Sequence, residues 1–91
     1  MILEIEISTH FKDQFGNEKN DELFLPIEND KPETDVMTEV NDLVNEWFYS
    51  VADDFCLTIW KEEGGGTDYE YEYFFENYLK NCFLNWNYKK N

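Results

Sequence analysis

Four acidic residues recur at intervals of four, three and four in the middle of the chain: Asp35, Glu39, Asp42 and Glu46. On an α-helix this spacing places them in one row, because residues three and four apart are neighbours on the helix surface. Like charges at these spacings cost about 0.2–0.5 kcal/mol per pair. No lysine occurs between Lys31 and Lys61 to offset that cost. The row therefore indicates a surface that binds a positively charged partner.

Further acids follow this row along the chain. They are Asp53, Glu62, Glu63, Asp68, Glu70 and Glu72. Residues 28–76 hold fifteen acids and two lysines, whereas residues 77–91 hold three lysines and no acid. A field this negative attracts basic surfaces, so we predict that these ten acids contact a partner. The alternative is that the charge serves solubility alone.

Residues suited to catalysis or metal binding are scarce. The single histidine, His10, has no nucleophile at a recognisable spacing. The segment that starts at Asp13 lacks the glycine and the glutamate that a calcium loop requires. Cys56 and Cys82 stand 26 residues apart, and there is no second pair of cysteines, so the sequence contains no zinc-binding motif. We predict that the protein is not an enzyme and holds no metal and no cofactor.

The composition limits the class of partner. The 91 residues include 21 acids, seven lysines and no arginine, which gives a formal net charge of −14. Nucleic-acid-binding proteins are basic, so we expect no direct binding of DNA, RNA or an anionic membrane. No basic signal segment and no apolar run of membrane-spanning length is visible. We expect a cytoplasmic protein of a bacterial cell, either a monomer or a small homo-oligomer.

Hydrophobic spacing predicts six elements within one domain, residues 1–91. Residues 1–10 and 22–27 alternate as strands do, and a helix is expected from Thr34 or Asp35 to about Asp53. Alternation returns over residues 55–61 and 68–73, which predicts two more strands, with the tyrosines inward and a mobile glycine-rich hairpin tip between them. A second helix is expected from Phe74 to Trp86. The result is an α+β fold, a small antiparallel sheet with two helices on one face, in the order ββαββα.

In length, acidity and acid clusters such as Asp53-Asp54, Glu62-Glu63 and Asp68-Tyr-Glu-Tyr-Glu72, the chain resembles the small acidic DNA-mimic proteins of phages and mobile elements. It particularly resembles anti-CRISPR proteins. The resemblance implies that the protein inhibits a CRISPR effector by occupying a basic cleft meant for DNA, where arginine side chains read the protospacer-adjacent motif. An immunity protein that neutralises a bacterial toxin nuclease is the alternative. A structural or regulatory subunit is a third interpretation.

Overall fold

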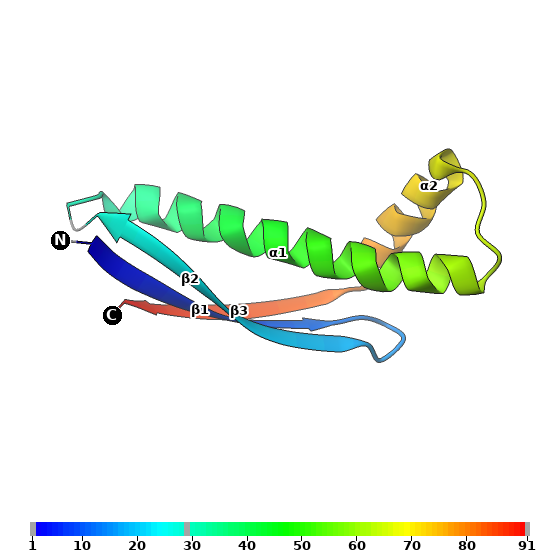
Figure 1. Ribbon diagram of the computed structural model, residues 1–91, viewed down its shortest axis with the longest axis horizontal. Helices are drawn as coiled ribbons and strands as arrows, with labels where there is room; N and C mark the ends of the chain where they lie inside the picture. Colours follow the sequence, from blue (N-terminus) through cyan, green and yellow to red (C-terminus); the bar gives the residue numbers. More distant parts are fainter. Residues whose placement is uncertain (1, 29, 91) are drawn as a thin grey trace.

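The computed structural model describes residues 2–28 and 30–90. They form a three-stranded antiparallel sheet, with a long helix along one face of the sheet and a short helix packed against the carboxyl-terminal part of the long one (Figure 1). The elements are β1 (Ile2–Lys12), β2 (Glu18–Glu28), α1 (Glu33–Glu62), α2 (Asp68–Leu79) and β3 (Phe83–Lys90). The predicted order ββαββα with four strands is therefore wrong, because the chain runs ββααβ.

The hairpin of β1 and β2 follows from the alternation in the sequence. Ile5 and Ile7 are fully buried on the helix-facing side of β1 and pair with Leu25 and Leu23 of β2. The turn is held by Asp13, whose Oδ1 accepts hydrogen bonds from the backbone N–H groups of Phe15 and Asn17, both at 2.9 Å. The carboxylate thus accepts hydrogen bonds from backbone N–H groups that a tight turn would otherwise leave without a partner.

Helix α1 continues through residues 55–61, which we expected to form a strand. The expectation failed because every residue from 55 to 60 except Thr58 is apolar or cysteine, so both periods fit. Asp54 lies 18 residues after Val36, which is about five whole turns at 3.6 residues per turn, so the two residues share one side of the helix. If the same side were buried along the whole helix, Asp54 would be buried with Val36. In the structure Asp54 is exposed while Ala52 and Cys56 are buried, so the buried face turns around the helix.

Helix α2 replaces the strand that we expected over residues 68–73. Thr67 caps it, because the threonine hydroxyl accepts a hydrogen bond from the backbone N–H of Glu70 at 3.2 Å. Thr67 and Glu70 stand at capping-box spacing, a helix-start signal that outweighs the tyrosine alternation. The helix also separates the tyrosines. Tyr71 is half-buried, whereas Tyr69 and Tyr73 are 67% and 58% exposed, so the prediction that all three point inward is wrong.

Strand β3 occupies the region where we expected the second half of a helix. It pairs antiparallel with β1, with Phe11 opposite Leu84 and Thr9 opposite Trp86. Its residues alternate, since Leu84, Trp86 and Tyr88 pack towards the helices while the asparagines between them are exposed. A central β1 needs hydrogen-bonding partners on both sides, and β3 supplies the second side.

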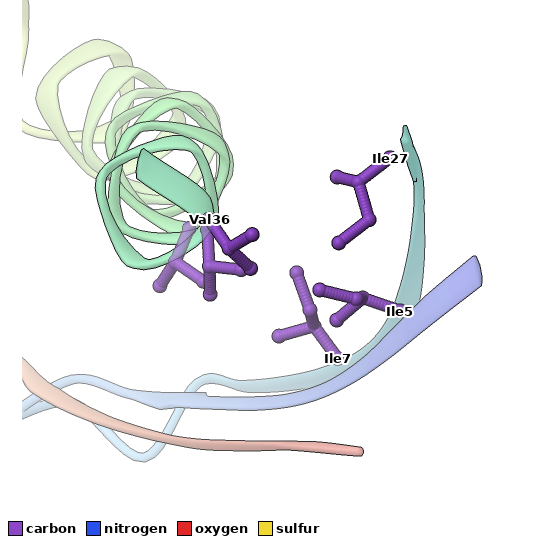
Figure 2. Packing of buried hydrophobic residues seen from close by; sticks show 6 residues of the cluster. Ile5, Ile7, Ile27 and Val36 are labelled. Carbon is purple, nitrogen blue, oxygen red and sulfur yellow. The ribbon is translucent and has the colours of Figure 1, made fainter. Parts of the chain in front are cut away.

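The core forms two adjoining clusters under the helices. One lies between the sheet and the amino-terminal half of α1, where Ile5, Ile7 and Ile27 point towards the valines of the helix, Val36 among them (Figure 2). The other joins Phe11 of β1 to the carboxyl-terminal half of α1 and to Tyr78 of α2. The long helix α1 therefore links both clusters and fixes the position of the acids on its outer side.

The glycine-rich segment connects two helices, so our expectation of a hairpin tip between two strands is wrong. Gly64 and Gly65 adopt positive φ angles of 101° and 68°, which L-residues with side chains avoid. The backbone N–H of Gly65 donates to the carbonyl oxygen of Trp60 at 2.9 Å and closes the end of α1. The segment is thus a helix stop with defined hydrogen bonds.

Gly66→Ala is expected to destabilise this connection by about 1–3 kcal/mol, because the added methyl group would overlap two neighbouring side chains and force them to shift. A Cβ at Gly66 would lie 2.8 Å from a ring carbon of Trp60 and 2.6 Å from the Glu70 carboxylate. Urea unfolding would measure the loss. In a Trp60→Leu background the same change should cost less, and an equal cost in both backgrounds would contradict this explanation.

Candidate partner-binding surface

The predicted acidic row lies along one side of α1. Asp35, Asp42 and Glu46 are exposed and Glu39 is partly exposed. Asp53 continues the row at the same helical spacing, and Tyr49, which is 53% exposed, fills the position between Glu46 and Asp53. We call the five acids Asp35, Glu39, Asp42, Glu46 and Asp53 the α1 row. The row spans about 27 Å at 1.5 Å per residue.

A lysine next to the helix compensates part of the row. The Lys31 Nζ lies 2.8 Å from the Glu39 Oε1, and this hydrogen bond raises the pKa of Lys31. From the sequence we expected the row to be uncompensated, because Lys31 precedes the helix. Glu39 is therefore already paired, whereas Asp42 and Glu46 have no hydrogen bond or ion pair within residues 2–28 and 30–90.

The helical layer carries most of the negative charge. Residues 33–76 include thirteen acids and one lysine. Of the five ion pairs that the described residues form, two reach these acids, Lys31–Glu39 and Lys90–Glu33, while the other three lie within the sheet. The lysines thus pair mainly within the sheet, and the side of the molecule formed by the helices keeps an excess of carboxylates.

Asp53 has a structural contact besides its place in the row. The hydroxyl of Tyr71 on α2 donates a hydrogen bond to the Asp53 Oδ1 at 2.5 Å. Burial and this hydrogen bond raise the pKa of the Tyr71 hydroxyl. Asp53 therefore helps to join α1 to α2, and we expect its substitution to affect stability as well as binding.

The remaining predicted acids lie around the connection between the helices and on α2. Glu62 ends α1, Glu63 follows it as the cap, and both are exposed. Asp68, Glu70 and Glu72 stand in the first half of α2 and are exposed as well. The structure thus gathers these five acids at the far end of α1 (Figure 1), next to the end of the α1 row.

Two tyrosines and two glutamates form a small hollow on α2 that we did not predict from the sequence. It has a volume of about 180 Å³ and is lined by Tyr69, Glu72, Tyr73 and Glu76. The rings of Tyr69 and Tyr73 meet edge to face, with their centroids 5.4 Å apart. These four residues stand at the spacing i, i+3, i+4, i+7, which brings side chains together only on a helix. We expected a strand over most of this segment, so the spacing did not reveal the hollow. Exposed aromatic rings beside carboxylates suit a cationic side chain.

The outer face of the sheet differs in chemistry from the helical layer. A shallow depression of about 420 Å³ crosses the three strands, with side chains of Ser8, His10, Asn20, Asn85 and Asn87 in its lining. The His10 Nδ1 is hydrogen-bonded to the Asn20 Oδ1, and the ring of Phe83 packs edge-on against His10. The histidine is therefore held by an amide and an aromatic ring, and no hydrogen bond joins it to the Ser8 hydroxyl within the described residues.

The two cysteines are free thiols. Cys56 is buried in α1, and burial raises the pKa of its thiol. The pKa of Cys82 is raised to about 11, mainly by burial. Thiols with raised pKa values are protonated near neutral pH and are poor nucleophiles. Among the described residues, no three potential metal ligands converge.

A buried carboxylate joins α2 to the β1–β2 turn. Asp13 is 4% exposed and its Oδ2 accepts hydrogen bonds from the hydroxyl of Tyr78 at 2.6 Å and from the Asn17 amide at 2.8 Å. Burial raises the pKa of Asp13, but these bonds and the two from the backbone outweigh it and leave the pKa below its usual value. The ionised form is therefore the one that the fold stabilises.

Tyr78→Phe is expected to lower the free energy of unfolding at pH 7 by about 1.5–3 kcal/mol, the usual worth of a hydrogen bond to a charged group. Because the folded pKa of Asp13 is depressed, its contribution is present above the unfolded pKa and is lost as the pH falls through the folded pKa. The parent and the variant should therefore converge in stability in acid. Urea unfolding at pH 7 and near pH 2 would show this, with the exposed Tyr49→Phe as the control. A gap that stays constant with pH would contradict it.

No protein-family model matches the chain, and no curated protein or solved structure is significantly similar to it. Within the described residues, neither helix is long and apolar enough to cross a membrane. The surface chemistry alone therefore bears on what the protein does.

Proposed function

We propose that the protein is an acidic inhibitor that binds the basic nucleic-acid-binding cleft of a CRISPR effector in the bacterial cytoplasm and keeps DNA out. The observation that carries the proposal is the excess of thirteen acids over one lysine in residues 33–76, on one side of the sheet. Self-repulsion of this kind opposes folding. A positively charged partner would offset this repulsion between the carboxylates, and the same charges would then attract the partner.

The geometry of the α1 row supports a phosphate-like role. Acids four residues apart on a helix are separated by about 6 Å along the axis, a spacing close to that of neighbouring phosphates in a nucleic-acid strand. The row is held by a helix whose inner side is fixed to the sheet through Val36, Val40 and Val44. The backbone that carries the carboxylates is thus held in a fixed arrangement, so that binding has to order only the side chains.

The energy of such binding comes from many weak contacts. A single exposed ion pair contributes about 0–1 kcal/mol, so no one acid suffices. The exposed rings of Tyr49, Tyr69 and Tyr73 stand among the acids and can add apolar contact area. Aromatic side chains are enriched among the residues that dominate interface energies. We expect acids to set the orientation and rate of binding, and tyrosines to slow dissociation.

The proposal is tested by binding assays against purified effector–guide complexes and against toxin nucleases. We expect a complex with an effector whose affinity falls at least about tenfold between about 50 and 200 mM salt, because the attraction is between exposed charges. Binding to a toxin nuclease instead would favour the immunity-protein alternative. Binding to an effector with no salt dependence would contradict the acidic surface as the contact.

A further inference from the structure

The sheet has two free edges, and they differ in how they are protected. β2 carries four acids and Pro26, which are features that discourage pairing with another strand. β3 contains no acid and no proline over its eight residues, and its two protective charges, Lys89 and Lys90, stand together at its carboxyl-terminal end, away from Trp86. Within the described part of the chain, no strand pairs with β3 on the side away from β1. The backbone groups of that edge are therefore available to another strand.

The side chains next to the β3 edge are incompletely covered. α1 packs mainly over β1 and β2. As a result Leu84, Trp86 and Tyr88, which face the helices, are only half-buried, whereas Ile5 and Ile7 of β1 are fully buried. An acid-free edge bordered by half-buried aromatic side chains is a surface where further apolar area can be removed from water.

We propose that two copies of this chain pair through their β3 strands, antiparallel and centred on Trp86, into one six-stranded sheet. In this register Asn85 faces Asn87 of the second copy, and Leu84 faces Tyr88 of the second copy. The two Trp86 side chains meet at the two-fold axis on the helix side of the sheet. Because the contact is isologous, every pairing except the Trp86 pair on the axis occurs twice, and the assembly closes as a dimer.

Charge favours the β3 edge over the helical layer and over the β2 edge for self-association. Two copies with a net charge of −14 each repel strongly, and residues 77–91 are the segment without acids. Strands lie about 4.8 Å apart, so two α1 helices above β1 and β2 would be about 20 Å apart across the axis. This exceeds the Debye length of about 8 Å at physiological ionic strength. The repulsion between the two α1 rows is therefore largely screened.

The dimer has a consequence for the acidic surface. A two-fold axis perpendicular to the sheet places both helical layers on the same side. The two α1 rows then face the same direction, and the β3 edge is closed without covering either of them. The assembly presents two acidic surfaces at once and leaves the more acidic β2 edges as its ends.

The test is sedimentation velocity of the full chain over a thousandfold range of concentration, up to the millimolar. We expect a monomer–dimer equilibrium. Asn85→Glu with Asn87→Glu places carboxylates directly opposite one another in the proposed register, and like charges so placed are destabilising. This variant should remain monomeric at concentrations at least tenfold above the midpoint of the parent.

Two further variants make the test specific. Asn85→Glu with Asn87→Lys places opposite charges face to face in the same register, and we expect it to dimerise again. Asn41→Glu with Asn45→Glu adds the same two charges on exposed positions of α1 and should leave dimerisation unchanged. Circular dichroism would confirm that each variant is folded. A parent that stays monomeric throughout, or a dimer that the first variant leaves intact, would overturn the proposal.

Discussion

Reversing the charge of Asp42 and Glu46 together, as Asp42→Lys with Glu46→Lys, is expected to weaken binding to the partner about 100-fold. That is about 2.8 kcal/mol at 1.4 kcal/mol per tenfold change. Each reversal removes an attraction and adds a repulsion in the centre of the α1 row. Both side chains are exposed and neither is hydrogen-bonded within the described residues, so the fold should be unaffected. Equilibrium binding to the effector would measure the loss.

The matched control reverses two charges elsewhere. Glu4→Lys with Glu22→Lys makes the same change in net charge on the outer face of the sheet, where both glutamates are exposed. We expect it to weaken binding by no more than about threefold, since exposed charges beyond a Debye length are screened. Equal losses from both pairs would mean that total charge acts rather than the α1 row. No loss from the first pair would remove the α1 row from the interface.

Phe11→Ala is expected to destabilise the protein by about 3–5 kcal/mol, the usual cost of truncating a buried phenylalanine. Phe11 is fully buried, and its ring lies 5.7 Å from the rings of both Phe48 and Phe55, measured between centroids. Both partners belong to α1, so the ring joins the central strand to the long helix. A loss of this size is a large fraction of the roughly 5–15 kcal/mol that holds a typical domain together. Urea unfolding followed by circular dichroism would measure it.

Phe24→Ala provides the matched aromatic control for this prediction. Phe24 lies on the neighbouring strand but on the outer face of the sheet, and it is 53% exposed. We expect a cost within about 0.5 kcal/mol, as for most surface substitutions. If the two variants were equally destabilised, the helices could not lie on the face of the sheet that the structure gives them.

The first part of the fold was predictable because its signals are local. Leu3, Ile5 and Ile7 alternate with polar residues, and only a strand brings them to one face. The valines that follow Thr34 recur at helical spacing, which only a helix satisfies. In both segments one period fits and the other does not, so no information from the rest of the chain is needed.

The second part was not predictable by alternation. Residues 55–60 are almost all apolar, so they fit a strand and a helix equally, and α1 continues because its buried face turns to meet α2. In residues 68–73 the tyrosines alternate with acids, but Thr67 begins a helix by capping Glu70. Strand β3 depends on a partner more than seventy residues away, β1, and a periodicity over eight residues carries no such information.

The candidate site also has a part that local spacing predicts and a part that depends on contacts between distant segments. The positions of Asp35, Glu39, Asp42 and Glu46 in one row follow from helical spacing alone. The contact of Lys31 with Glu39 and that of Tyr71 with Asp53 depend on how the chain turns before α1 and after it. The pairing that brings Asn85 beside His10 on the outer face required β3, a segment that we expected to be helical.

The most direct test of the central claim is a competition measurement. The dissociation constant of the effector–guide complex for its DNA would be measured by fluorescence anisotropy in the presence of increasing concentrations of this protein. If the carboxylates of the helical layer occupy the DNA cleft, the apparent constant rises in proportion to the concentration and DNA is fully displaced at saturation. A ternary complex in which the effector holds both ligands with unchanged affinity for DNA would contradict the claim.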